Sequence, residues 1–420
     1  MEDIAVAAKN HSQWMANPPL QAGEWVDSRI YSDEQIFEEE LEKIFKGTWI
    51  PVCHESELPK AYDFRTTSIA REPIIVCRGP DNQIRAFLNV CPHRGMMIER
   101  RPAGSFLEGQ PSGNPKRMTC MFHGWQFDMK GSCVYVAREK EGYQDRLCKE
   151  DVGLRRLRCE VKFGGFVWVN LNDQAMDLEE WCGKPFECLR KTLDAEPMEV
   201  FHYHKAIVDT NYKLWHDTNA EFYHDFMHYH NRVTGFNEDY FARKNEAFDH
   251  GHVVVGTFTV DYEKYEGFES RASLSFPHLP PNQWYMIDLF PGVNFNLRGS
   301  ALRCDVVTPL GPNKVMIEFR GLGLKSDSAE DRMTRIKHHN SIWGPFGRNL
   351  HEDLIGVQGQ GNTMKTGAEP RRILHGRQEN QTIHDENGMR HYYDEWGRWL
   401  NRLPSDPEKP YAEPATVAAE

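Results

Sequence analysis

Two short segments, Cys91-Pro92-His93 and Cys120-Met121-Phe122-His123, identify the fold of this chain. Each segment pairs one cysteine with one histidine, and 26 residues separate His93 from Cys120. The first segment follows an apolar run with the pattern of a strand, and each is short enough to be a turn. Two such turns side by side present two thiolates and two imidazoles to one centre. We therefore predict that Cys91, His93, Cys120 and His123 are ligands of a single site.

The type of centre follows from how the ligands are paired. Thiolates suit zinc or iron–sulfur clusters, and imidazole suits zinc and iron. Structural zinc sites commonly pair like ligands in each half, whereas here each half mixes a cysteine with a histidine. Two histidines replacing two cysteines on one iron is the Rieske arrangement. Gly95 and Gly124 allow the backbone to approach such a cluster closely. The prediction is a Rieske [2Fe-2S] cluster, with structural zinc as the alternative.

A second group of metal ligands is predicted in the segment from 216 to 230. Glu221 and His224 lie three residues apart, and His224 and His228 lie four apart, so all three can share one helical face. Two imidazoles and one carboxylate on one side of an iron(II) ion leave positions open for dioxygen and substrate. The segment Glu352-Asp353-Leu354 is the expected source of the carboxylate. The alternative for any one of these histidines is an ordinary core or surface role.

Together, these motifs resemble the α subunits of Rieske non-heme iron oxygenases over nearly the whole chain. The resemblance implies a mononuclear Fe(II) held by His224, a second histidine and Asp353, with Glu221 as the bridging carboxylate. This chain departs from the family in two positions. The bridging residue is usually Asp, and the second histidine is commonly five residues after the first, where this chain has Tyr229. We prefer His228, which keeps the helical face, with His230 as the alternative.

The long gap between the two Cys/His segments resembles the methanesulfonate-oxidising branch of this family. The additional segment, roughly 102–116, is rich in Gly, Pro and Ser and is expected to be a surface loop. This resemblance implies hydroxylation of a small organic anion, methanesulfonate, to give formaldehyde and sulfite. Such an anion needs a small pocket with at least one cation or several hydrogen-bond donors. The candidate cations are Arg298, Arg303 and Arg320, although a surface role is the simpler expectation for each. An aromatic-ring dioxygenase is the alternative.

Electrons are expected to come from another protein, because no G-x-G-x-x-G motif follows a predicted strand. The resemblance implies a ferredoxin and an NADH-dependent reductase as partners, a small β subunit, and an α3β3 ring. In that ring Glu221 bridges His123 or His93 of one chain to His224 or His228 of the next. The alternatives of other classes are an electron-transfer Rieske protein and a zinc-stabilised binding protein.

Composition excludes two broad classes of function. The chain has 420 residues, 50 Lys+Arg and 62 Asp+Glu, for a net charge of −12. This acidity argues against nucleic-acid binding, and no apolar run reaches the ~18 residues of a membrane span. Ten cysteines without a visible secretory signal are expected to be free or metal-bound in a cytoplasmic protein.

The predicted fold class is α+β, with a small all-β Rieske domain inserted into a catalytic domain that has an antiparallel sheet covered by helices. The Rieske domain is predicted at 46–172, and the catalytic domain at 1–45 and 173–420. Residues 178–231 are expected to be largely helical, with further helices at 329–354 and 386–400. Strands of the catalytic sheet are expected at 252–260, 272–276, 284–290, 301–308 and 314–319.

Overall fold

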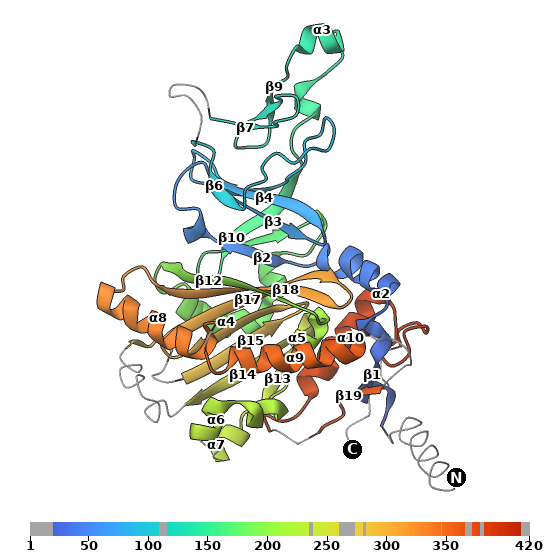
Figure 1. Ribbon diagram of the computed structural model, residues 1–420, viewed down its shortest axis with the longest axis vertical. Helices are drawn as coiled ribbons and strands as arrows, with labels where there is room; N and C mark the ends of the chain where they lie inside the picture. Colours follow the sequence, from blue (N-terminus) through green and yellow to red (C-terminus); the bar gives the residue numbers. More distant parts are fainter. Residues whose placement is uncertain are drawn as a thin grey trace.

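The computed structural model describes residues 20–108, 116–234, 238–259, 274–279, 283–345, 347–365, 372–378 and 382–412. Within this part of the chain, two seven-stranded antiparallel sheets are flanked by helices, and a three-stranded sheet lies at one end of the molecule (Figure 1). The predicted α+β class is confirmed. None of the helices within these ranges has the length and apolar character that a bilayer-spanning segment needs.

The first seven-stranded sheet has the order β2-β11-β10-β5-β4-β3-β6. Its strands are β2 (Ile50–His54), β3 (Asp63–Ile69), β4 (Glu72–Arg78), β5 (Ile84–Leu88), β6 (Ala103–Ser105), β10 (Arg156–Lys162) and β11 (Phe166–Asn170). The small sheet consists of β7 (Met118–Thr119), β8 (Gln126–Phe127) and β9 (Cys133–Tyr135). All of these strands lie inside the segment 46–172, whose limits as a domain stay a prediction. Of the expected loop at 102–116, residues 109–115 lie outside the described part of the chain.

The second sheet, in the order β12-β18-β17-β16-β15-β14-β13, is the predicted antiparallel sheet of the catalytic domain. Its strands are β12 (Met198–Val208), β13 (Asn245–Phe248), β14 (His252–Thr259), β15 (Gln283–Leu289), β16 (Val293–Arg298), β17 (Ala301–Gly311) and β18 (Lys314–Leu324). The prediction of a largely helical region at 178–231 is wrong for β12. That strand lies at the sheet edge, and its many half-exposed side chains blur the alternation typical of a strand. The predicted strand at 272–276 begins outside the described residues.

Helices cover the second sheet, and one of them carries the predicted ligand Asp353. The longer ones are α4 (Leu178–Leu193), α5 (Tyr212–Ala220), α8 (Ala329–Trp343), α9 (Leu350–Met364) and α10 (Asn387–Leu400). The single helix predicted at 329–354 is wrong, because the chain breaks between α8 and α9. Gly344 adopts an extended conformation before Pro345, and the residue before a proline disfavours helical geometry. Asp353 therefore lies in the first turn of α9, not at the end of one long helix.

Shorter elements complete the described fold. Asp33 caps α2 (Glu34–Glu39) by accepting a hydrogen bond from the backbone N–H of Ile36 (2.9 Å). The others are β1 (Trp25–Asp27) paired with β19 (Arg372–Leu374), α3 (Glu139–Tyr143), α6 (Tyr229–Thr234) and α7 (Glu238–Phe241).

The two faces of the second sheet have different chemistry. Phe295 of β16 packs against Phe166 of β11, with 5.0 Å between ring centroids, so this face is apolar and meets the first sheet. Because side chains alternate along a strand, Asn294, Asn296 and Arg298 point to the opposite face, where Arg298 contacts α8 and the start of α9. The polar face of the sheet therefore lies toward the helix that carries Asp353.

Candidate metal centres

The two predicted Cys/His segments fold into equivalent turns. In the first, the N–H of Gly95 donates to the carbonyl of Cys91 (2.9 Å), and the N–H of Cys91 donates to Met96 (2.8 Å). In the second, Gly124 donates to Cys120 (3.0 Å), and Cys120 donates to Trp125 (2.8 Å). Gly95 and Gly124 have φ angles of +74° and +71°, which side chains disfavour. Glycine four residues after each cysteine thus closes both turns.

The structure brings the four predicted cluster ligands together. Cys91 and Cys120 are buried free thiols, and the rings of His93 and His123 lie 4.6 Å apart between centroids. Burial and the neighbouring Cys120 thiol raise the pKa of Cys91 to about 11, so a cationic centre would be needed to hold the Cys91 sulfur as a thiolate. Nδ1 of His93 is buried without a hydrogen-bond partner. Two thiols and an orphaned imidazole nitrogen fit a Rieske cluster.

The segment with the second ligand group is not one continuous helix, so the predicted helical face is wrong. Helix α5 ends at Ala220, and Glu221 is extended, with φ −133° and ψ 154°. A short 3₁₀ helix follows at Tyr223–Met227, and His228 is again extended. The Glu221 carboxylate accepts hydrogen bonds from the backbone N–H groups of Tyr223 and His224, and so caps this turn.

The predicted ligands nevertheless converge, through their Nε2 atoms. Nε2 of His228 lies 3.2 Å from Oδ1 of Asp353, and Nε2 of His224 lies 3.6 Å from the same oxygen. Burial lowers the pKa of His228, but the Asp353 carboxylate raises it to about 9. The same carboxylate would stabilise a metal cation held by these imidazoles. This donor set fits a mononuclear iron with two imidazoles and one carboxylate.

The opposite nitrogen of each imidazole is held by a glutamate. Nδ1 of His224 lies 2.7 Å from Oε1 of Glu221, and Nδ1 of His228 lies 2.9 Å from Oε2 of Glu352. A carboxylate at Nδ1 fixes the proton there and leaves the lone pair of Nε2 for a metal. The sequence placed Glu352 next to Asp353, but its separate role depends on the start of α9 and was not predicted.

Asp225 is a further buried carboxylate that the sequence did not reveal. Its ligand atoms and those of His224 and His228 lie within 4.8 Å of one another. Asp225 Oδ1 accepts a hydrogen bond from Nδ2 of Asn231 (3.1 Å). Asp353, by contrast, faces both Nε2 atoms, so we keep Asp353 as the predicted ligand. The side chain of His230 lies outside the described part of the structure.

The three arginines suggested for substrate binding differ in position. The expectation of a surface role is wrong for Arg303 and Arg320, which are 2% and 1% exposed. Arg320 donates to Glu57 (2.9 Å) and to the carbonyl of Val52 (3.0 Å), so it ties the two sheets together. Arg298 and Arg303 lie on the polar face of the second sheet, as their register opposite Ala301 and Asn296 requires.

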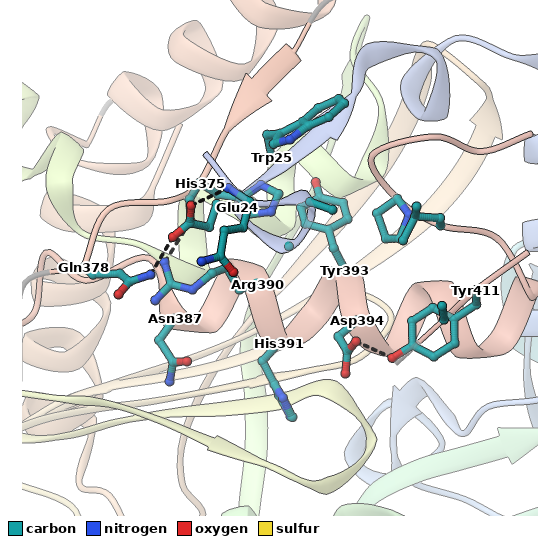
Figure 2. A pocket seen from close by; sticks show the side chains of 16 residues that line it. Glu24, Trp25, His375, Gln378, Asn387, Arg390, His391, Tyr393, Asp394 and Tyr411 are labelled. Carbon is teal, nitrogen blue, oxygen red and sulfur yellow. Dashed lines mark hydrogen bonds between the residues drawn. The ribbon is translucent and has the colours of Figure 1, made fainter. Parts of the chain in front are cut away.

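A cleft of about 550 Å³ lies elsewhere, between the segment around β1 and helix α10 (Figure 2). At one end, Nε2 of Gln378 donates to Glu24 (2.7 Å), and at the other end Tyr411 donates to Asp394. Figure 2 shows Arg390 and His391 on α10 between these two contacts. None of the predicted metal ligands lines this cleft, so it is separate from both predicted metal centres.

Comparisons with known proteins agree with these two centres. Residues 48–150 match the model of the Rieske [2Fe-2S] domain, and residues 194–402 match that of the ring hydroxylating alpha subunit (catalytic domain). The methanesulfonate monooxygenase hydroxylase subunit alpha of Methylosulfonomonas methylovora is 83% identical, over 98% of this chain and 99% of that protein. The 2-aminobenzenesulfonate 2,3-dioxygenase subunit alpha of an Alcaligenes species is 38% identical, over 94% and 98%.

Solved structures show the same fold. Naphthalene 1,2-dioxygenase from a Rhodococcus species superposes with a TM-score of 0.74 and 20% identity, covering 90% of this chain and 94% of that one. A quaternary ammonium Rieske monooxygenase gives a TM-score of 0.70 and 21% identity, covering 90% and 98%.

Proposed function

Because this chain belongs to the α subunits of the Rieske ring-hydroxylating oxygenases, we propose that it is the terminal oxygenase component that hydroxylates methanesulfonate. As a member of this family, the chain is an oxidoreductase that uses dioxygen and electrons from partner proteins. The observation that carries the substrate is the 83% identity to a methanesulfonate monooxygenase subunit over nearly the full length of both chains. The second relative, at 38% identity, is also named for a sulfonate.

The proposed reaction balances with NADH as the electron source. Methanesulfonate, dioxygen, NADH and one proton give hydroxymethanesulfonate, NAD⁺ and water. The hydroxyl then loses its proton, the C–S bond breaks with its electron pair on sulfur, and formaldehyde and sulfite leave. The NADH is oxidised at a separate reductase, with a ferredoxin as the proposed carrier.

Two groups of predicted residues would hold the two cofactors of the family. Cys91, His93, Cys120 and His123 would hold the [2Fe-2S] cluster, and His224, His228 and Asp353 would hold the mononuclear Fe(II). When bound, the cluster supplies single electrons and the Fe(II) supplies activation of dioxygen. Glu221 and Glu352 orient the two imidazoles through Nδ1, which supports this ligand set.

We propose a head-to-tail ring, α3β3 with a small β subunit, because the two centres lie far apart within one chain. Figure 1 shows β7 and β9 at one end of the molecule and α6 at the other. Met121 and Phe122, beside His123, are 61% and 56% exposed, and Phe226 and Ile355, near His224 and Asp353, are 52% and 72% exposed. Two exposed apolar patches, one at each centre, fit a contact that closes a ring.

A cytoplasmic location is part of the proposal. The nine cysteines that the structure describes are free thiols, which is the state that a reducing compartment maintains.

Glu221→Gln is expected to slow electron transfer between the centres by about 10- to 100-fold while both metals stay bound. The neutral amide keeps the size of the side chain but weakens the charge-assisted hydrogen bond to Nδ1 of His224 (2.7 Å). Single-turnover oxidation of the reduced cluster, followed by its visible absorbance, measures the rate. Oxidation at the wild-type rate would remove Glu221 from the electron path.

The proposed function is tested by oxygen uptake and sulfite release in the reconstituted system. Methanesulfonate is compared with 2-aminobenzenesulfonate, benzoate and naphthalene at equal concentrations. Sulfite and formaldehyde formed in equal amounts from methanesulfonate support the proposal. A cis-diol formed from any arene, with no sulfite from methanesulfonate, would overturn it in favour of a ring dioxygenase.

A further inference from the structure

A row of alternating arginine and tryptophan side chains lies on the polar face of the second sheet. The guanidinium carbons of Arg243 and Arg298 lie 4.4 and 4.7 Å from the ring centroid of Trp284. Those of Arg298 and Arg303 lie 5.4 and 4.9 Å from the centroid of Trp343. Each indole thus contacts two guanidinium groups, and Arg298 is the central cation of the row.

The register of the strands explains how the row forms. Arg298 of β16 lies opposite Trp284 of β15, and Arg303 of β17 lies opposite Asn296, two residues before Arg298. Because side chains alternate, all of these point to one face. Trp343, in the last turn of α8, then packs over both arginines.

Two of the three guanidinium groups in this row are deeply buried. Arg243 and Arg303 are 5% and 2% exposed, and charges buried to this degree are costly unless they are paired. Asp305 pairs with Arg303 through Nη2 (2.5 Å). The aromatic faces offset part of the remaining cost through cation–π contact. Arg303 is thus paired at Nη2, and its Nε is left for a further acceptor.

Two buried donors in this row lack an acceptor in the described part of the structure. Nε1 of Trp343 and Nε of Arg303 are both buried with no hydrogen-bond acceptor in the structure, whereas Nε1 of Trp284 donates to Asn296 (2.8 Å). Buried polar groups in proteins are nearly always satisfied, so an orphaned pair indicates a missing acceptor. A sulfonate offers three acceptor oxygens and one negative charge.

The row lies one helical turn from the predicted iron ligand. Nη2 of Arg298 donates to Oδ1 of Asn349 (3.3 Å), and the carbonyl of Asn349 accepts from the backbone N–H of Asp353 (3.4 Å). At the other end, Trp284 contacts Phe222, the residue after Glu221, with 5.2 Å between ring centroids. Asn349 thus joins Arg298 to the turn of α9 that carries Asp353.

We propose that Arg298, Arg303 and Trp343 bind the sulfonate group of a small alkanesulfonate and so position its carbon at the iron centre formed by His224, His228 and Asp353. This inference rests on the proposed function and adds the residues that determine its specificity for an anion. Arginine suits the role because its guanidinium is planar, always charged and weakly hydrated. Arg320 has no part in it, because it lies on the opposite face with Glu57.

The test measures binding to the oxidised holoenzyme by titration calorimetry, without turnover. The probes are trifluoromethanesulfonate, a non-reactive anion, and dimethyl sulfone, its neutral counterpart. Arg298→Gln is expected to raise the Kd of the anion by about 10- to 100-fold, as for the loss of one charged hydrogen-bonding group, and to leave dimethyl sulfone unchanged. The Kd of the anion for Arg298→Lys should lie between the values for the wild type and for Arg298→Gln, because lysine keeps the charge but lacks the planar guanidinium.

Arg71→Gln is the matched control, because Arg71 also lies over an aromatic ring, that of Phe37 (5.3 Å), but in the turn between β3 and β4 of the first sheet, where it pairs with Glu38 (2.8 Å). It should bind both probes as wild type does. Trp343→Phe keeps an aromatic ring but removes the Nε1 donor together with part of the indole, so it should weaken anion binding even if Arg298→Gln loses iron. Iron content and the cluster spectrum check that the variants are intact.

Two results would overturn the inference. One is anion binding by Arg298→Gln and Trp343→Phe within about twofold of wild type, and the other is an equal loss of affinity for the anion and for dimethyl sulfone. The proposed function is judged separately, by sulfite release from the wild-type system. Normal sulfite release with an unchanged KM in Arg298→Gln would reject this binding site and leave methanesulfonate as the substrate.

Discussion

Cys120→Ser is expected to abolish the Rieske spectrum and all turnover. Cys120 is 1% exposed and lies in a turn closed by Gly124, so a serine would occupy the ligand position but offer a hydroxyl in place of a thiolate. A serine hydroxyl is a hard ligand and far less acidic than a thiol, whereas the cluster irons need soft thiolates. Without the cluster no electron reaches the catalytic centre. Visible and electron paramagnetic spectra, with iron and sulfide assays, measure the loss.

Cys133→Ser and Cys304→Ser are the controls for this prediction. Cys133 is a buried thiol in β9, beside the same turns, and Cys304 is a buried thiol in β17. Both variants should keep the red colour and the characteristic spectrum, although each loses some stability by burying a hydroxyl. A cluster that survives in Cys120→Ser, or disappears equally in Cys133→Ser, would mean that the ligand assignment is wrong.

The four cluster ligands could be predicted because the information is local. Each Cys/His pair lies within one turn, and Gly95 and Gly124 close these turns through positive φ angles that can be anticipated from the sequence. Only the meeting of the two turns depends on the rest of the fold. The structure brings His93 and His123 to 4.6 Å between ring centroids, as the mixed pairs require.

The structure brings the predicted residues of the second centre together, but not in the predicted geometry. Spacings of three and four residues suggest a helical face, yet His224 and His228 meet through a 3₁₀ turn between two extended residues. The Glu221 side chain stabilises this turn by capping it, which a periodicity argument does not detect. Glu352 reaches Nδ1 of His228 only because Pro345 separates α8 from α9 and places Glu352 in the first turn of α9.

The arginine row was beyond prediction from the sequence for a different reason. Arg298 and Arg303 were named as separate cations, but their relation depends on the register of β16 against β15 and β17. It also depends on Trp343, which α8 brings over the sheet from 40 or more residues away along the chain. A one-residue shift in register would turn these side chains to the apolar face.

The second histidine ligand can be decided by comparing two variants. His228→Ala is expected to lose catalytic iron and turnover while keeping the cluster, because Nε2 of His228 faces Asp353 at 3.2 Å. His230→Ala should keep both metals. Loss of iron in His230→Ala alone would show that His230, and not His228, is the second histidine ligand.

Asp353→Ala is expected to keep the red cluster and to lose the catalytic iron together with all turnover. Asp353 is the carboxylate that faces Nε2 of both His224 and His228, and two neutral imidazoles alone bind iron(II) weakly. Total iron and sulfide per chain, measured beside oxygen uptake, should show two irons remaining with both sulfides. His224→Ala should give the same pattern.

Asp225→Asn is the decisive control for Asp353, because Asp225 is the competing buried carboxylate beside the same two histidines. The amide preserves the size of the side chain and its acceptor oxygen toward Asn231, so this variant should keep its iron and most of its turnover. If Asp225→Asn loses the catalytic iron and Asp353→Ala retains it, Asp225 is the carboxylate ligand. Glu221 and Glu352 hold the Nδ1 atoms of both imidazoles, so the Nε2 side of each ring faces Asp353. This geometry favours loss of iron in Asp353→Ala and its retention in Asp225→Asn.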